Sequence, residues 1–306
     1  MLRKVIAIGV LLACLLAVAA VWRNAGGAGK TVKPGGGAKI AVIRMEGVLS
    51  GGATADGWNA SGAGAETLAR QLGEARRDPE VKAVLLRINS PGGSVAAAEE
   101  VAREIARFKQ SGKPIVASMG DMAASAGYWL AASCDKIYAN QATLTGSIGV
   151  YVPYLNLEGL YDKLGVKQDK IKSGQHKDIL SPDRPMTPAE REILQTLVTE
   201  MYEAFVAVVS DGRKLSPEAV RKLADGRIYT GRQAKALGLV DELGNFQDAI
   251  IATGLLAGLG ENPEVKEMSD EQPWRRWLRA ESLVEYVLQR QAGLGLLNLP
   301  VPSGPQ

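Results

Sequence analysis

Short apolar runs alternate with amphipathic segments through most of this chain. Runs rich in Val, Ile and Leu predict strands at 39–43, 81–88, 114–118 and 136–139. Apolar residues spaced three and four positions apart predict helices at 65–77, 94–109, 122–132 and 158–164. Two further extended segments are expected at 151–155 and around 166–171. Alternating strands and helices predict an α/β domain with a largely parallel sheet.

One long helix is predicted from Pro188 to about Ser210. Thr187 suits the N-cap, proline suits the first helical position, and Glu190 completes a capping box three residues after the cap. A buried stripe along this helix is expected to consist of Leu194, Leu197, Met201, Phe205 and Val208.

The amino-terminal end combines two basic residues with an apolar stretch at 5–22. Eighteen helical residues span ~27 Å, which is enough to cross a hydrocarbon core. Because Arg3 and Lys4 precede the stretch, we expect a transmembrane signal-anchor at 1–23 with the rest of the chain exported. Cleavage after the small residues at 17–19, or lipid attachment at Cys14, are open alternatives.

The remainder divides into three parts by composition. A Gly-rich linker is expected at 24–37, a globular domain at 38–260, and a tail of uncertain structure at 261–306. Within the tail, the Trp-Arg-Arg-Trp cluster at 274–277 suits a membrane interface, although a packed amphipathic helix is the favoured interpretation.

Charge and cysteine content exclude several classes of protein. The 36 basic and 33 acidic residues are interspersed, which argues against a nucleic-acid partner. Cys14 and Cys134 are the two cysteines and have no metal-ligand spacing, so we expect no disulfide, no metal and no cofactor. A Ser-His-Asp triad would have to use His176, because the chain has one histidine.

Two motifs stand at junctions between a predicted strand and a predicted helix. Asn-Ser-Pro-Gly-Gly-Ser at 89–94 can turn with its N–H groups exposed, as an oxyanion hole requires. Ser125 lies among Ala and Gly in the second motif at 120–129, where a substrate backbone could approach a nucleophile. The alternatives are an ordinary turn and a small-residue helix packed against the sheet.

A third motif, Lys-Ser-Gly-Gln-His-Lys-Asp at 172–178, offers a general base for Ser125. A lysine acts as a base only when neutral, which requires desolvation to lower its pKa from ~10.4 to about 7–8. Solvent-exposed side chains are the ordinary alternative for His176 and Lys177.

Taken in order, these motifs and Thr-Gly-Ser-Ile-Gly-Val at 145–150 resemble the signal peptide peptidase A family in its short, single-domain form. The resemblance extends from about residue 40 to 255 and implies a crotonase-like or Clp-protease-like α/β spiral. It also implies particular site residues, namely Ser125 as nucleophile, Lys177 as base, Ser147 as the residue that orients the lysine, and the N–H groups of Gly93 and Ala126 as oxyanion donors. Ala126 stands where glycine is common in the family.

The same resemblance implies a membrane-anchored serine endopeptidase that degrades remnant signal peptides outside the cytoplasm. It further implies a homo-oligomeric ring in which neighbouring protomers contribute serine and lysine to one site. Three alternatives remain, which are another membrane-bound Clp-class Ser-Lys protease, an acyl-CoA enzyme of the crotonase fold, and an inactive assembly module. The export segment speaks against the second, and the presence of Ser125 and Lys177 against the third.

Overall fold

The computed structural model describes residues 37–53 and 62–268. The predicted anchor, all but the last residue of the predicted linker, and the Trp-Arg-Arg-Trp cluster lie outside the described residues.

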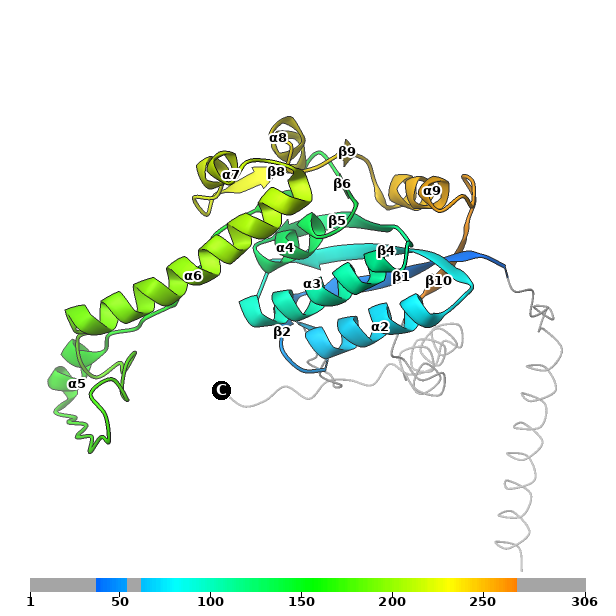
Figure 1. Ribbon diagram of the computed structural model, residues 1–306. Coiled ribbons are helices and arrows are strands. Elements are labelled where there is room, and N and C mark those ends of the chain that lie inside the picture. Colours follow the sequence, from blue (N-terminus) through cyan, green and yellow to red (C-terminus); the bar gives the residue numbers. More distant parts are fainter. Residues whose placement is uncertain (1–36, 54–61, 269–306) are drawn as a thin grey trace, which may run out of the picture. The chain divides into compact units, whose positions relative to one another are not determined.

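A mostly parallel sheet forms the centre of the described domain (Figure 1). Its strands follow the order β10 (Glu264–Glu267), β1 (Lys39–Glu46), β4 (Val81–Ser90), β5 (Ile115–Ala124), β6 (Lys136–Ala139) and β9 (Glu242–Leu243). The second half of β5 pairs with β7 (Leu144–Gly146), which pairs antiparallel with β8 (Ile228–Thr230). A separate parallel pair joins β2 (Val48–Ser50) to β3 (Gly62–Gly64).

Helices cover both faces of the sheet because its strands are apolar on both sides. In β1, Ala41, Ile43 and Met45 belong to the core shared with α2 (Ala65–Arg77), α3 (Val95–Gln110) and α4 (Ala126–Ala132). The alternate residues Ile40 and Val42 pack with α9 (Phe246–Leu256) on the opposite face (Figure 1). The remaining helices are α5 (Glu158–Leu164), α6 (Pro188–Arg213), α7 (Pro217–Leu223) and α8 (Gly231–Ala236).

The predicted α/β class with a largely parallel sheet is confirmed, with local corrections. The helix predicted at 122–132 begins at Ala126, because residues 122–124 continue β5 and pair with β7. The extended segments predicted at 151–155 and 166–171 form no strand, since their backbone pairs with no sheet edge. Beyond residue 260, β10 adds a parallel strand beside β1.

The predicted buried stripe of α6 is wrong. Of its five residues only Phe205 is buried, and Leu197 is 47% exposed. The buried side chains of the helix are Glu190, Phe205, Val206 and Val209. The helix packs against α4 and α7 through its carboxyl-terminal half, which leaves most of the other half exposed.

The predicted start of α6 is confirmed. Thr187 Oγ1 accepts a hydrogen bond from Glu190 N at 3.2 Å, and the Glu190 carboxylate accepts one from Thr187 N at 2.9 Å. Among the described residues, α6 is also the helix long and apolar enough to cross a membrane by length and composition. Core helices of soluble proteins share that property, so it is weak evidence for a membrane span.

Candidate active site

Ser125 occupies the corner between β5 and α4. Its backbone angles, φ 52° and ψ −123°, are ones that residues with a side chain rarely adopt. Two hydrogen bonds hold this conformation, from Ser125 N to Gly146 O and from Trp129 N to Ser125 O, both 2.9 Å. Such strain costs about 1–3 kcal/mol and persists only where the surroundings enforce it, which is typical of functional sites.

The Pro-Gly-Gly turn faces this corner. A β-carbon on Gly92 (φ 117°) would lie 2.7 Å from Ser125 Cβ and 3.1 Å from Ser125 Oγ. A β-carbon on Gly93 (φ 154°) would lie 2.0 Å from Leu49 O. Hydrogen bonds from Leu49 N to Gly92 O (2.8 Å) and from Ser94 N to Leu49 O (2.9 Å) hold the turn against β2. Only glycine therefore fits at either position.

Two N–H groups near Ser125 are available to bind an oxyanion. Within the described part of the chain, neither Gly93 N nor Ala126 N donates to a backbone or side-chain acceptor. Ala126 is the first residue of α4, so its N–H has no acceptor within the helix. The turn and the helix start thus each leave one N–H group near Ser125 without an acceptor among the described residues.

Ser147 immediately follows β7, which pairs with the end of β5 that leads into Ser125. The register pairs Ala124 with Gly146, so the two serines follow paired residues of parallel strands, which lie ~4.8 Å apart. Ser147 also has a positive φ, 49°, and its N–H donates to Arg227 O at 2.8 Å.

Both serines line one open cavity of about 1120 Å³. The Pro-Gly-Gly turn forms part of its wall, and α6 contributes residues on a helical face. Apart from Pro91 and the glycines, its apolar lining consists of Val48, Val150, Tyr151, Pro153, Val198, Tyr202 and Ala224. Its volume is at the upper end of the range typical of ligand-binding pockets.

Lys177 is not brought to this cavity by its own chain. It lies in a series of turns before α6, is exposed, and is absent from the cavity lining. His176 is half-buried and is likewise absent from the lining. The structure therefore unites Ser125, Ser147, Gly93 and Ala126 and leaves the predicted base on a separate segment.

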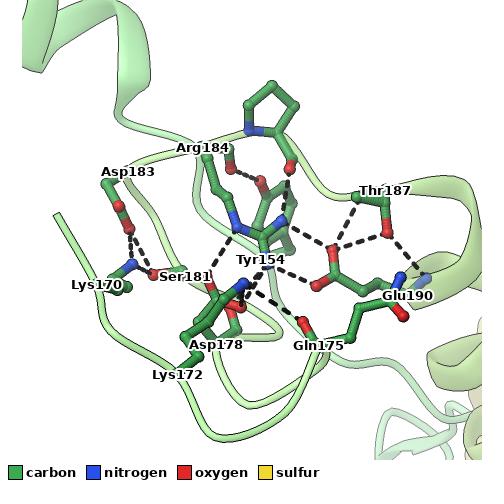
Figure 2. Close-up of polar contacts among 11 residues, drawn as sticks. Tyr154, Lys170, Lys172, Gln175, Asp178, Ser181, Asp183, Arg184, Thr187 and Glu190 are labelled. Carbon is green, nitrogen blue, oxygen red and sulfur yellow. Dashed lines mark hydrogen bonds and ion pairs between the residues drawn. The ribbon is translucent and has the colours of Figure 1, made fainter. Parts of the chain in front are cut away.

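An ionic network holds the segment that carries Lys177 (Figure 2). The Arg184 guanidinium contacts the carboxylates of Asp178 (2.9 Å) and Glu190 (2.6 Å). Hydrogen bonds from Arg184 and then from Thr187 N lower the pKa of Glu190 to about 2. Arg184, followed by Lys172, holds the pKa of Asp178 well below its usual range. The capping box predicted Glu190, but nothing in the local pattern indicated its bond to Arg184.

Comparison with known proteins places these residues in a family. The profile of peptidase family S49 matches residues 107–259, which include Ser125, Ser147 and Lys177. The chain is 41% identical to Protease 4 of Salmonella typhi over 223 residues, which are 73% of this chain and 35% of the relative. It is 46% identical to a putative protease of Synechocystis over 197 residues, 64% of this chain and 71% of the relative.

A further relative, the putative signal peptide peptidase SppA of Enterococcus faecium, is 40% identical over 69% of this chain and 62% of its own length. The chain thus spans about a third of Protease 4 and less than two thirds of the Enterococcus protein. Among solved structures, a ClpP1 mutant from Listeria monocytogenes aligns with 68% of this chain and 94% of its own, with a TM-score of 0.46 and 18% identity. The resemblance carried by the four motifs is confirmed, and the chain belongs to peptidase family S49.

Proposed function

We propose that this chain is a serine endopeptidase in which Ser125 is the nucleophile. The observation that carries the proposal is the strained Ser125 corner, which lines an open cavity and adjoins the free N–H groups of Gly93 and Ala126. Ser125 Oγ would attack the scissile carbonyl carbon, and the resulting oxyanion would accept hydrogen bonds from Gly93 N and Ala126 N. Departure of the amine leaves an acyl-enzyme, which water then hydrolyses.

Lys177 of a neighbouring copy is the proposed general base. Among the described residues, the cavity lining contains no lysine, arginine or histidine, and its one carboxylate, Asp225, is paired with Arg227. A neutral Lys177 amine would take the proton from Ser125 Oγ and return it to the leaving amine. Ser147, beside Ser125, would accept a hydrogen bond from that amine and orient it.

Assembly into a ring would bring the lysine to the serine. Large hydrophobic side chains are exposed along residues 151–197, which lie between the serine-bearing strands and the packed half of α6. They are Tyr151, Leu155, Leu160, Leu164, Val166, Ile171, Leu180, Ile193 and Leu197. Monomeric soluble proteins rarely expose so much apolar surface, and contact between copies would bury it.

Hydrophobic peptides are the proposed substrates, specifically signal-peptide remnants left after export. The apolar cavity lining supports this choice, as does the name of the Enterococcus relative, a putative signal peptide peptidase. An anchor at 1–23 would hold the domain at the outer side of the cell membrane, beside such remnants. The proposed reaction requires neither a cofactor nor a nucleic acid.

Covalent labelling of the full-length chain tests this function. A fluorophosphonate should label the wild-type protein and the Ser133→Ala control, and labelling should disappear in Ser125→Ala. The labelled protein should cleave signal-peptide sequences faster than charged peptides of equal length. An unlabelled wild-type chain that hydrates acyl-CoA would favour the crotonase-type alternative, and a chain inert in both assays would favour the assembly module.

Membrane topology has its own test. An alkaline phosphatase fused after Gly37 should be active in cells, because the anchor would place the domain outside the cytoplasm. An inactive fusion, together with full protection of the domain from protease added outside spheroplasts, would rule out the exported placement.

A further inference from the structure

We infer that Arg184 is a positioning residue for Lys177, an inference that rests on the proposed function for the identity of the base. Arg184 does not line the cavity of Ser125 and would act through the segment that carries the lysine. Its effect would be twofold, fixing where this segment lies and compensating the charge next to Lys177.

The geometry of Arg184 makes it a bridge between two carboxylates (Figure 2). Its Nε and Nη2 donate to the two carboxylate oxygens of Asp178 at 3.0 and 2.9 Å. Its Nη1 and Nη2 donate to those of Glu190 at 2.9 and 2.6 Å. The planar guanidinium suits such double contacts, which a lysine cannot reproduce. The Asp178 and Glu190 side chains are only 9% and 2% exposed, and the Arg184 side chain is 26% exposed.

This bridge links the Lys177 segment to a rigid element. Glu190 belongs to the capping box at the start of the 26-residue helix α6, so its carboxylate is fixed by Thr187 N and Oγ1. Arg184 is itself held from the other side, since Tyr154 Oη donates to Arg184 O at 2.6 Å. Asp178 immediately follows Lys177, so the helix determines where the lysine backbone lies.

The Lys177 segment depends on this bridge because it contains no regular secondary structure. Its own backbone hydrogen bonds are single turns, from Lys177 N to Gly174 O (3.2 Å), from Ile179 N to His176 O (3.1 Å) and from Ser181 N to Asp178 O (3.0 Å). Side-chain bonds from Lys172 to Gln175 O and from Lys170 to Ser181 add links within the same loop. Turns of this kind define a local shape and give little resistance to displacement of the whole segment.

Arg184 also pairs with the carboxylate that follows the proposed base in sequence. Loss of Arg184 would leave Asp178 with Lys172 as its remaining partner, and a less compensated carboxylate favours the protonated form of a nearby amine, which cannot act as a base. In the structure, Asp178 is paired with Arg184 and also with Lys172 at 2.7 Å. Within the described residues, Lys177 pairs with no carboxylate. The Asp178 carboxylate is therefore paired with Arg184 and Lys172 and not with Lys177.

The test compares full-length Arg184→Met and Arg184→Lys, with Arg191→Met on exposed Arg191 as the control for loss of a nearby positive charge. Hydrolysis of a hydrophobic fluorogenic peptide is measured across pH, together with amide exchange of residues 174–181. For Arg184→Met we expect a kcat about 100-fold lower, a nearly unchanged KM, and an acidic limb of the pH profile shifted to higher pH. Arg184→Lys should restore the acidic limb and part of kcat.

Amide exchange at 174–181 should be at least about tenfold faster in Arg184→Met and unchanged in Arg191→Met. Asp178→Asn breaks the same bridge without leaving a charge, so it should lower kcat without the upward shift of the acidic limb. If the Arg184→Met variant does not fold, the Asp178→Asn variant is measured in its place.

The inference would be overturned if the Arg184→Met variant had the same amide exchange rates and the same kcat as the wild type. A loss of kcat with no change in the pH profile and no recovery in Arg184→Lys would also overturn it, because it would indicate a purely structural role. A wild-type protein that neither labels nor cleaves peptide would instead refute the proposed function, and the exchange measurement would still decide whether Arg184 holds the segment.

Discussion

At the scale of single residues, backbone strain gathers around the proposed site. Among the described residues, four other than glycine have a positive φ. Ser125 and Ser147 line the cavity, and Leu180 lies in the turns that follow Lys177. The fourth, Lys214, is an ordinary left-handed cap at the end of α6. Strain at the two serines is thus maintained where the proposed chemistry needs their hydroxyls in fixed positions.

A methyl group at Gly92 should disable the site. The Gly92→Ala β-carbon would meet Ser125 Cβ at 2.7 Å, so the turn or the nucleophile must move. We expect kcat/KM to fall at least about 100-fold, because small misplacements of reacting groups are costly. Gly112→Ala is the matched control, since Gly112 also has a positive φ (77°) but open space around it. Equal activity of the two variants would contradict this account of the turn.

Lys177→Ala should abolish peptide hydrolysis, while His176→Ala should retain most of it. The reason is that the family resemblance assigns the base to Lys177 and not to His176. Peptidase assays on the two purified variants make the comparison. If the His176→Ala variant is inactive and the Lys177→Ala variant is active, the base is His176 and not Lys177.

The sequence was most informative about single residues. Small residues around Ser125 and the glycine pair at 92–93 limited which side chains could approach the nucleophile, and the structure brings these motifs together. The positive φ of Ser125 could not be predicted, because serine has no intrinsic preference for it. Arg184 was also missed, since its partners are defined by how the loop folds back onto α6.

At the scale of elements, α6 differs most from its predicted role. Apolar residues at helical spacing predicted burial along its whole length, yet burial of apolar side chains is confined to its carboxyl-terminal half. Periodicity reports which face of a helix is apolar and cannot say whether that face contacts its own domain or another molecule. The strands predicted at 151–155 and 166–171 are absent for a related reason. An apolar run forms a strand only where a sheet edge is available to pair with it, which the sequence pattern does not reveal.

Acid should loosen the Lys177 segment while the sheet remains folded. The pKa values of Glu190 (about 2) and Asp178 are lowered by Arg184, with further contributions from Thr187 N and Lys172 respectively. Since both folded pKa values lie below the ordinary values of ~3.9–4.3, their stabilisation is complete above about pH 5 and is lost as pH falls toward 2.

Amide exchange of residues 174–190 and of β4, corrected for the intrinsic rate at each pH, checks this expectation. The 174–190 segment should lose protection at a higher pH than β4. Glu190→Gln should show the loosened segment already at neutral pH. Simultaneous loss of protection in both regions would contradict a separately stabilised segment.

At the scale of the whole molecule, the proposed site is divided between two parts of the chain. The cavity and Ser125 belong to the sheet and its flanking elements, whereas Lys177 lies in the exposed segment before α6. A division of this kind makes activity depend on association between copies, and association in turn would cover the apolar residues of 151–197.

Mixing two inactive variants should therefore restore activity. Ser125→Ala and Lys177→Ala proteins, combined in equal amounts, would each supply the half that the other lacks. With random order in a closed ring, about a quarter of the interfaces would be competent. Peptide hydrolysis is measured after native mass spectrometry has verified exchange of subunits. Absence of rescue under those conditions would mean that one chain supplies both residues.

The strand β10 has a consequence for solubility. It covers the edge of β1 and carries charged, exposed residues, with ion pairs from Arg44 to Glu267 and from Lys266 to Asp78. Edge strands of this composition discourage the addition of strands from other molecules. A fragment that ends at residue 260 would remove this cover and leave unpaired the edge of β1 that faces away from β4. Such a fragment would expose a template for edge-to-edge aggregation, even though every residue of the proposed site is still present.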